Sequence, residues 1–315
     1  MTRAVIATEF GGPEVLSVID ETVREPGPGE VLLAVRAAGT NPIDYKLFSG
    51  SHGADPSMLP FRPGLEAAGV VVAVGEGAEG PAGPLSVGDE VIAYRIDGAY
   101  ADRVVVPART VVPKPTTLSF EEAGGLLLAG STAVHALVAV EVGSGDTVLI
   151  NGASGGVGTI AVQVAVDLGA RVIATAGHAG HDRLRRLGAE PVTYGEGLLD
   201  RVRALAPDGV DAALDLVGTD EALDTSLALV ADRDRIATIA GFQRGLAEGI
   251  RVLGGAPGAD PGEAIRDAAR LQLVALAEAG KLEVPVARAY PLEEAAAALT
   301  ELAAGHTHGK IVLVP

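Results

Sequence analysis

A glycine-rich segment near the middle of the chain has the residue types and the spacing of a phosphate-binding turn. The apolar, β-branched run Val148–Ile150 predicts a buried strand, and the residues after the glycines carry no charge until Asp167, which predicts a helix. Glycines at such a turn let a pyrophosphate approach the backbone, and the helix N-terminus supplies free N–H groups and a positive dipole end. We therefore expect a dinucleotide to bind along Ala153, Ser154, Gly155, Gly156, Val157 and Gly158.

The residues after this helix complete a βαβ unit. Gly169 can end the helix in a left-handed conformation, and Arg171–Thr175 predicts a second, parallel strand. The strict Gly-x-Gly-x-x-Gly pattern is not met, because the matching frame begins at Ala153, so a turn that only packs a helix against a strand stays an alternative. The spacing also resembles that of short-chain dehydrogenases, but no tyrosine here has the lysine four residues on that this family uses.

The end of the second predicted strand bears on the choice of nicotinamide cofactor. Enzymes that bind NAD usually carry an acidic residue there, which accepts from the ribose 2′-hydroxyl. Here Ala176 and Gly177 hold that place, and no acid occurs between Asp167 and Asp182, so a 2′-phosphate is not repelled. We expect NADP (NADPH), with Gly177, His178 and Arg183 in contact with it. The basic residues downstream either face the phosphate or form the solvated face of a helix: His178, His181, Arg183, Arg185 and Arg186.

Composition narrows the classes of partner. The chain has 24 Lys and Arg against 41 Asp and Glu, a net charge of −17, which offers nucleic acid no attractive surface. It has no cysteine, so disulfides and thiolate zinc sites are excluded and a reducing cytosol is compatible. The first residues lack the apolar core of a signal peptide. The uncharged run Ala123–Val140 is interrupted by glycines and polar residues, so we expect a buried helix, no membrane partner and a cytoplasmic protein.

The hydrophobic pattern changes near Ser119, which predicts two domains. Up to about Thr117, short apolar alternations broken by Gly and Pro predict a compact β-barrel. Beyond Ser119, helix and strand alternate as in a doubly wound parallel sheet, and the pattern that begins at Asp260 predicts a helix to about Ala279. We expect one domain over residues 1–118 and 281–315 and the other over residues 119–280. The strands expected in the second are Val148–Ile150, Val172–Thr175, Pro191–Tyr194, Val210–Leu216, Arg235–Ala240 and an edge strand within Gly249–Gly254.

Six motifs in a fixed order carry a resemblance that runs nearly end to end. They are AAGTNPIDYKLFSG (Ala37–Gly50), PGLEAAGVVVAVG (Pro63–Gly75), VGDEV (Val87–Val91), GAYAD (Gly98–Asp102), NGASGGVG (Asn151–Gly158) and GKIVL (Gly309–Leu313). With them the chain resembles the medium-chain dehydrogenase/reductase superfamily, specifically its zinc-independent quinone oxidoreductase branch, which includes the zeta-crystallins. The resemblance implies an α/β protein in which a GroES-like β-barrel domain, built from both chain ends, accompanies a Rossmann domain, with the active site in the cleft.

The resemblance also implies an activity and its residues. The branch transfers hydride from a reduced nicotinamide to a quinone or an α,β-unsaturated carbonyl, and its members are homodimers. Asn41 and Tyr45 then line the substrate cleft, with the Asn41 amide donating to the carbonyl and Tyr45 acting as a proton donor or only packing. Asp44 is either catalytic or a carboxylate that caps the helix after Pro42. Thr132 matches the family threonine near the nicotinamide, or bonds back to its own helix.

Four further positions are expected beside the cofactor. Tyr194 matches a family tyrosine next to the adenosine. Val217, Ala240 and Gly241 follow predicted strand ends, which is where a doubly wound sheet binds its ligand.

We predict no bound metal. Zinc-type relatives place a Cys where this chain has Asn41 and a His where it has Leu65, and neither residue is a zinc ligand. Two closely spaced histidine pairs lack an acidic or thiolate partner pattern: His178 with His181, and His306 with His308.

Two other functions fit the same residues. One is an enoyl reductase that acts on a thioester-linked substrate. The other is a protein that binds NADPH without turnover, as the crystallin relatives illustrate.

Overall fold

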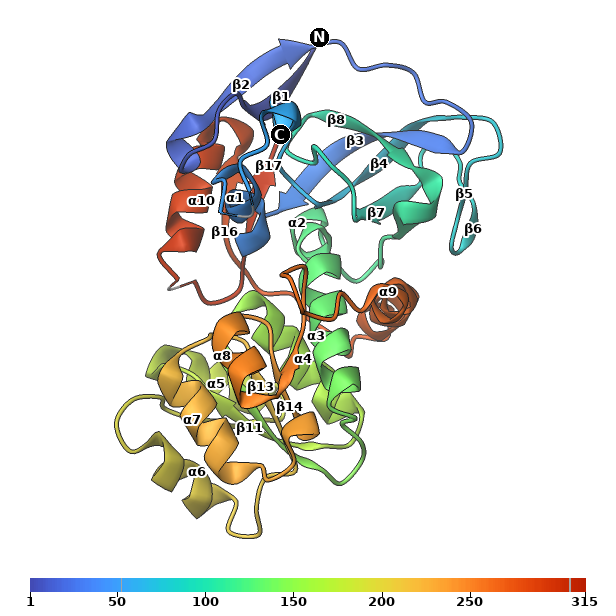
Figure 1. The fold of residues 1–315 in the computed structure, drawn as a ribbon. Coiled ribbons are helices and arrows are strands. Elements are labelled where there is room, and N and C mark those ends of the chain that lie inside the picture. The colour runs from blue at the N-terminus through green and yellow to red at the C-terminus, as the bar shows by residue number, and fades with distance from the viewer. Residues whose placement is uncertain (52, 306) are drawn as a thin grey trace. The chain divides into compact units, whose positions relative to one another are not determined.

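The computed structural model describes residues 1–51, 53–305 and 307–315, and its contacts divide the chain into two compact units (Figure 1). The β unit comprises Met1–Ala129 and Arg270–Pro315, and the α/β unit comprises Gly130–Ala269. The predicted boundaries, 118/119 and 280/281, lie outside the α/β unit at both ends. One reason is that helix α2 (Phe120–Gly124) packs on strands of the β unit. Another is that the last residues of α9 (Glu263–Glu278) bond to the segment around Thr116.

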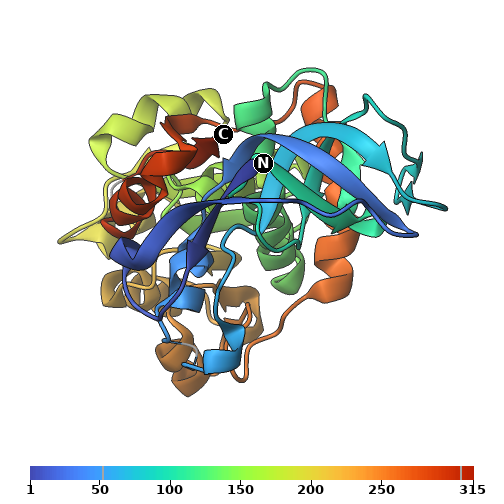
Figure 2. The ribbon, with the colours of Figure 1, turned by 90° about the horizontal axis from the view of Figure 1, so that it is seen from above.

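The β unit is built around a seven-stranded sheet to which both chain ends contribute. Its order is β16-β17-β3-β4-β7-β9. Strand β8 pairs with the first half of β3, residues 30–34, whereas β17 pairs with its last two residues. The last strand runs antiparallel to β3, with Val312 opposite Gly39, and the two chain ends lie close together (Figure 2). The sheet strands are β3 (Glu30–Gly39), β4 (Glu66–Val74), β7 (Glu90–Tyr94), β8 (Arg103–Pro107), β9 (Val111–Pro113), β16 (Val286–Pro291) and β17 (Lys310–Val314).

Smaller elements surround this sheet. Two pairs of strands and two further helices belong to the same unit: β1 (Thr2–Ala7) with β2 (Leu16–Glu21), β5 (Glu79–Gly80) with β6 (Gly83–Pro84), α1 (Pro42–Phe48) and α10 (Ala295–Ala303). The inward side chains form one core that includes Leu33, Phe48 and Tyr100. Each such buried side chain contributes about 1.5–3 kcal/mol relative to an exposed one.

The α/β unit is a doubly wound parallel sheet, which confirms the predicted fold class. The strand order β12-β11-β10-β13-β14-β15 places the point where the order reverses between β10 and β13. The strands are β10 (Thr147–Asn151), β11 (Arg171–Thr175), β12 (Glu190–Val192), β13 (Ala212–Asp215), β14 (Ile236–Thr238) and β15 (Arg251–Val252). The helices are α3 (Leu127–Ala139), in which one unit boundary falls, α4 (Gly156–Asp167), α5 (His181–Arg186), α6 (Leu198–Leu205), α7 (Asp220–Leu229) and α8 (Phe242–Glu248).

The expected strands all occur, but three are shorter than predicted. The predicted strands Pro191–Tyr194, Val210–Leu216 and Arg235–Ala240 become β12, β13 and β14. Strands β13 and β14 end early because the side chains of Asp215 and Thr238 bind the backbone N–H groups of the next residues and turn the chain.

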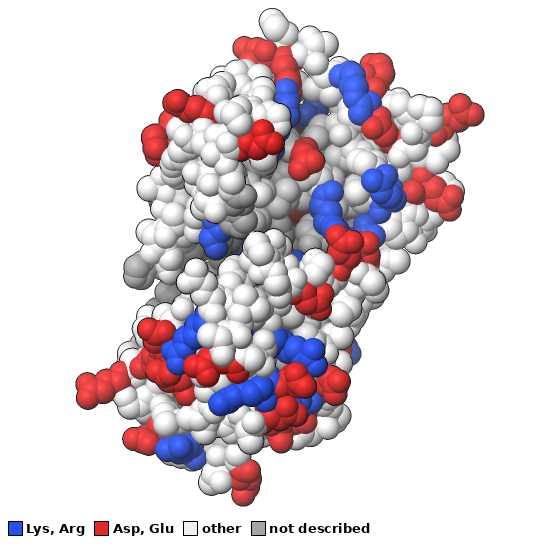
Figure 3. All heavy atoms as spheres, viewed as in Figure 1, with Lys and Arg blue, Asp and Glu red and all other residues white. Residues whose placement is uncertain are grey.

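The uncharged run Ala123–Val140 forms the end of α2 and the whole of α3. Among the described residues, no helix is long and apolar enough to cross a membrane. On the face that Figure 3 presents, acidic and basic side chains are intermixed rather than separated by sign.

Candidate functional site

The glycine turn joins β10 to α4 at the carboxyl edge of the parallel sheet. Gly152 has a φ of +78°, a left-handed conformation that favours glycine, and its N–H donates to Thr175 Oγ1 at 3.1 Å. The next N–H, of Ala153, donates to Thr175 O at 3.0 Å. Strand β11 thus holds the turn in place, and Gly155 follows as the N-cap of α4.

The glycines of this turn serve two different purposes. A Cβ added at Gly158 would lie 2.3 Å from Gly152 O and 2.6 Å from Ala153 Cα, so Gly158 is needed for the helix to pack on the turn. A Cβ added at Gly155 would meet only Gly152 O, at 3.5 Å, and the φ of Gly155 is −76°, which any residue adopts. Neither packing nor backbone strain requires glycine at position 155. The open backbone there fits the close approach of a pyrophosphate.

Several other predicted cofactor residues follow neighbouring strands and come together at this edge. A Cβ at Gly152 would lie 3.3 Å from Val217 Cβ, and one at Gly218 would lie 3.0 Å from the Ala240 backbone. The loop after β11 meets the turn as well, because a Cβ at Gly180 would lie 3.2 Å from Ser154 Cβ. Tyr194 and Val217 are large side chains that are 58% and 49% exposed, which suits a surface covered by a ligand.

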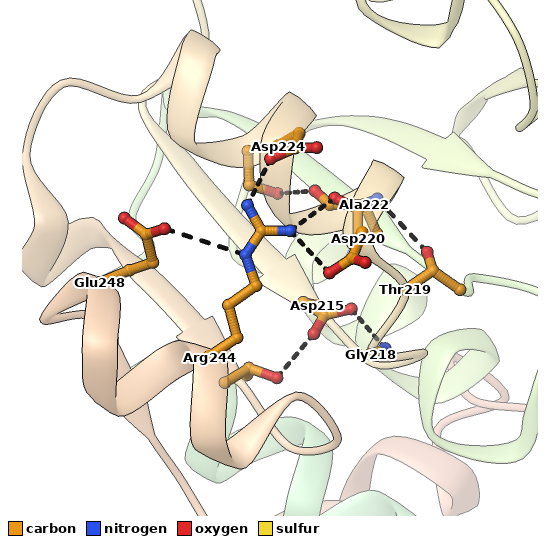
Figure 4. A network of polar contacts seen from close by, with 10 residues as sticks. Asp215, Gly218, Thr219, Asp220, Ala222, Asp224, Arg244 and Glu248 are labelled. Atoms are coloured by element: carbon orange, nitrogen blue, oxygen red, sulfur yellow. Dashed lines mark hydrogen bonds and ion pairs between the residues drawn. The ribbon is translucent and has the colours of Figure 1, made fainter.

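Two buried residues that sequence reasoning missed shape the loops after β13 and β14. Asp215 accepts from the N–H of Gly218 at 2.8 Å (Figure 4). It also accepts from the N–H of Val217 at 3.2 Å. Its second oxygen accepts from Thr238 Oγ1 at 2.6 Å, and that hydroxyl accepts from the N–H of Gly241 at 2.8 Å. The predicted residues Val217, Ala240 and Gly241 are therefore held by one network. In the sequence, Asp215 could have been noticed as an aspartate at the end of an apolar strand.

An ion-pair cluster joins the helices after these two loops. Arg244 of α8 contacts Asp220 at 2.8 Å, Glu248 at 3.8 Å, and Asp224 (Figure 4). Asp220 and Asp224 belong to α7, so the cluster joins α7 to α8, and the nearby carboxylates raise the pKa of Arg244 further.

The loop after β11 lacks an acid at the position that usually binds the ribose 2′-hydroxyl. Ala176 is buried, and Gly177 is the first partly exposed residue. A Cβ at Gly177 would lie 3.6 Å from Tyr194 Oη, so these two predicted contacts are neighbours. His178 is exposed, with its ring 5.2 Å from that of His181. The other downstream basic residues lie on α5, where Arg185 pairs with Asp182 at 2.8 Å, Arg186 is exposed and Arg183 is partly buried.

Thr132 belongs to a polar cluster of the α/β unit. Its Oγ1 accepts from Arg266 Nη1 at 3.3 Å, and Arg266 Nε lies 3.3 Å from His135 Nδ1. Because Nδ1 accepts, the other ring nitrogen of His135 is the donor to Asp260 Oδ2, at 3.2 Å. Burial and the Arg266 charge lower the pKa of His135, which favours this neutral tautomer.

In the β unit, Asn41, Asp44 and Tyr45 lie at the start of α1. Asp44 Oδ2 accepts from the backbone N–H of Asn41 at 2.8 Å and from Tyr100 OH at 2.7 Å. Asp44 therefore caps α1, as one of the two interpretations expected. Tyr45 is partly exposed, its ring packs on the core of the β unit, and burial raises its pKa.

Asn41 is 2% exposed and its amide binds protein groups. Its Nδ2 donates to Glu66 Oε1 at 3.0 Å and to Gly39 O at 3.3 Å, and its Oδ1 accepts from Lys310 Nζ at 2.6 Å. In this arrangement the amide hydrogens have acceptors inside the unit, so the expected donation to a substrate carbonyl stays a prediction.

Asp44 is fully buried, and burial raises its pKa to about 7, although Tyr100 and Asn41 both donate to it. Among the described residues, its Oδ1 has no hydrogen-bond partner. The neighbouring Tyr100 has its pKa raised well above its usual value by burial and by Asp44. Around neutral pH, this carboxyl group therefore changes between its acid and its charged form.

Within the described residues, no three His, Cys, Asp or Glu side chains gather as a metal site. Of the two histidine pairs noted in the sequence, His178 and His181 lie together, whereas His306 lies outside the described residues.

Family models match both parts of the chain. Residues 27–116 match the alcohol dehydrogenase GroES-like domain, and residues 187–313 match a model described as zinc-binding dehydrogenase.

Curated relatives and solved structures agree over the whole chain. A quinone oxidoreductase of Pseudomonas aeruginosa is 36% identical, with all of both chains covered, and the mouse quinone oxidoreductase is 31% identical over all of this chain and 98% of its own. Among solved structures, a mycobacterial protein complexed with NADPH is 33% identical over all of both chains, with a TM-score of 0.84.

Two further structures cover 99% of this chain and 99% of their own. They are an NAD-dependent alcohol dehydrogenase, 32% identical with a TM-score of 0.86, and the CurK enoyl reductase, 26% identical with a TM-score of 0.85. With its glycine turn, its strand order and these relatives, the chain belongs to the zinc-independent quinone oxidoreductase branch of the medium-chain dehydrogenase/reductase superfamily and is a nicotinamide-dependent oxidoreductase.

Proposed function

We propose that this protein is an NADPH-dependent reductase that transfers hydride to a quinone or an α,β-unsaturated carbonyl without zinc. The observation that carries the proposal is Gly155. Its backbone is open at the N-terminus of α4, at the point where the strand order reverses. Among the described residues, neither packing nor the backbone conformation requires a glycine there. The bound nicotinamide supplies the hydride, and the protein orients it and the acceptor.

The preference for NADPH is supported by the loop after β11. A 2′-phosphate would meet no carboxylate at Ala176 or Gly177, and His178, Arg183 and Tyr194 lie on the segments beside them. A similar structure was solved with NADPH, whereas another similar one is named NAD-dependent. Because similar structures with either cofactor in their names exist, a substitution in this loop is the sharpest test of the proposed preference.

Operation without zinc is supported by the residues around Asn41. The ammonium of Lys310 lies between the Asn41 amide and the Glu66 carboxylate. A cationic side chain therefore already lies beside Asn41, the position at which zinc-type relatives carry a Cys. We propose Asn41, Asp44 and Tyr45 as the residues of the β unit that act on the acceptor. Tyr45 is the candidate proton donor, since Asn41 and Asp44 are buried and bonded to neighbours.

A second candidate is reduction of a thioester-linked enone, favoured by the similarity to the CurK enoyl reductase. The proposal also includes a homodimer, by analogy with the family. It further includes a cytoplasmic location, with which a chain without cysteine is compatible. Binding of NADPH without turnover is the remaining alternative.

The test is the oxidation of NADPH, with NADH in parallel, against an ortho-quinone, a para-quinone, a 2-alkenal, a cyclic enone and a thioester-linked enone, with metal analysis of the same preparation. Faster turnover with NADPH on free quinones or enones is expected. Activity confined to the thioester supports the second candidate. Tight binding of NADPH without turnover supports the remaining alternative, a protein that binds the cofactor but does not react. Stoichiometric zinc contradicts the proposal that the protein works without zinc.

A further inference from the structure

A buried lysine of the β unit enters the proposed function only as a cation beside Asn41, with no part in the reaction. Lys310 is the first residue of β17, and its side chain is 6% exposed. Burying an ammonium group and a carboxylate is costly, and an apolar pair of similar volume is often at least as stable. The ion pair of Lys310 with the fully buried Glu66 is therefore better explained by a geometry that it imposes than by stability.

The three hydrogens of the Lys310 ammonium have three acceptors. They are Thr40 O at 2.9 Å, Asn41 Oδ1 at 2.6 Å and Glu66 Oε1 at 3.2 Å. Because a lysine only donates, the amide oxygen of Asn41 must face it, and the amide nitrogen must then face Glu66. The other oxygen of Glu66 accepts from the N–H of Leu128 at 2.8 Å. The Asn41 amide cannot flip without placing its NH₂ group against the ammonium.

The stem of Lys310 is held as firmly as its ammonium group. A Cβ added at Gly125 would lie 3.0 Å from Lys310 Cγ and 3.1 Å from Lys310 Cε, so the lysine runs along a bare glycine backbone. The pairing of β17 with β3 sets Val312 opposite Gly39, directly before Thr40 and Asn41. Two regions far apart in sequence are thereby fixed at the beginning of α1.

We propose that Lys310 is a positioning residue for acceptor reduction. Acting through Asn41, it holds the start of α1, and with it Tyr45, in the arrangement that receives the acceptor. The inference rests on the proposed function, in which Asn41 and Tyr45 act on the acceptor. Asp44 fixes the backbone N–H of Asn41 at 2.8 Å, whereas Lys310 and Glu66 fix its side chain.

The test compares Lys310→Met with Lys114→Met. Lys114 is a matched control, because its side chain is also 6% exposed in the β unit. Its ammonium pairs with Glu90 and binds the carbonyls of Pro115 and Leu118, none of which belongs to α1. Lys310→Met should lower kcat/KM for the acceptor by roughly 10- to 100-fold, the usual cost of a small misplacement of reacting groups. The Kd of NADPH should change less than about twofold, a ratio that is negligible in binding free energy. Lys114→Met should change neither quantity.

The outcomes separate this inference from the proposed function. An unchanged acceptor kcat/KM in Lys310→Met overturns the inference and leaves the function standing, as does an equal loss in both lysine variants. No turnover by the natural protein overturns both.

Two further variants keep the inference testable if Lys310→Met does not fold. The double variant Lys310→Met with Glu66→Gln removes both buried charges and should show the same loss of acceptor kcat/KM. Gly125→Ala leaves the charges in place but crowds the lysine stem, and should show a smaller loss in the same quantity. Full acceptor activity in both variants would overturn the inference.

Discussion

The glycine turn of the α/β unit and the polar cluster around Asn41 in the β unit differ in what they leave open. At the turn, the backbone of Gly155 has no neighbour that a methyl group would disturb. In the cluster, every hydrogen of Lys310 Nζ has an acceptor, and both oxygens of Glu66 are bonded. The backbone at Gly155 thus leaves room for a ligand. In the cluster around Asn41, the Lys310 ammonium has no hydrogen left to donate to one.

The largest effect is expected within the turn itself, where Gly158 and Gly155 differ. Gly158→Ala places a Cβ 2.3 Å from Gly152 O and should lower stability by about 3 kcal/mol or more, as overpacking at a rigid backbone does. Gly155→Ala should cost less than about 1 kcal/mol, because the site is open and its φ suits alanine. Urea unfolding of both variants measures the difference. Equal losses would remove the distinction between a packing glycine and a binding glycine.

The next effect concerns the loop after β11. Gly177→Asp introduces the missing carboxylate at a position where a Cβ meets only Tyr194, at 3.6 Å. The carboxylate should accept from a 2′-hydroxyl and repel a 2′-phosphate, which shifts the NADPH-to-NADH ratio of kcat/KM towards NADH by about 10-fold or more. Ala231→Asp adds the same charge at an exposed position after α7 and should leave the ratio unchanged. A Gly177→Asp ratio equal to that of the natural protein would show that Gly177 does not border the 2′ position.

The smallest effect concerns the pH dependence of stability that Asp44 causes in the polar cluster around Asn41. Native Asp44 holds its proton up to about pH 7, whereas an unfolded aspartate loses it near pH 4, so the folded state binds more protons between these values. The free energy of unfolding therefore falls as the pH rises through this window and loses this dependence above it. Asp44→Asn keeps an acceptor for Tyr100 and for Asn41 N–H but does not titrate, so its stability should fall less.

Urea unfolding from pH 5 to pH 8 measures this difference. Asp200→Asn, at an exposed position, is the control and should follow the natural protein. An Asp44→Asn variant that also follows the natural protein at every pH would contradict the raised pKa of Asp44.

The sequence predicted the turn well because its determinants are local. Strand, glycines and helix are contiguous from Val148 to Asp167, and the alternation of strands and helices indicated the parallel sheet. The polar cluster around Asn41 could not be predicted in this way. Lys310 and Asn41 are 269 positions apart, and the strand pairing that joins them is set by the whole sheet. Asp215 and Thr238, 23 positions apart, were missed because their role is to bind loop backbone that only the fold brings near.

We propose that the cofactor binds at the open backbone of Gly155. Titration of NADPH against the natural protein, Gly155→Val and Gly143→Val tests it most directly. Gly143 also has open space around its Cβ position and no positive φ, but it precedes β10 at the opposite edge of the sheet. We predict that Gly155→Val weakens NADPH binding at least about 100-fold, roughly 2.7 kcal/mol, with its unfolding midpoint little changed, while Gly143→Val binds as the natural protein does. Undiminished binding by a folded Gly155→Val protein would contradict cofactor binding at this glycine.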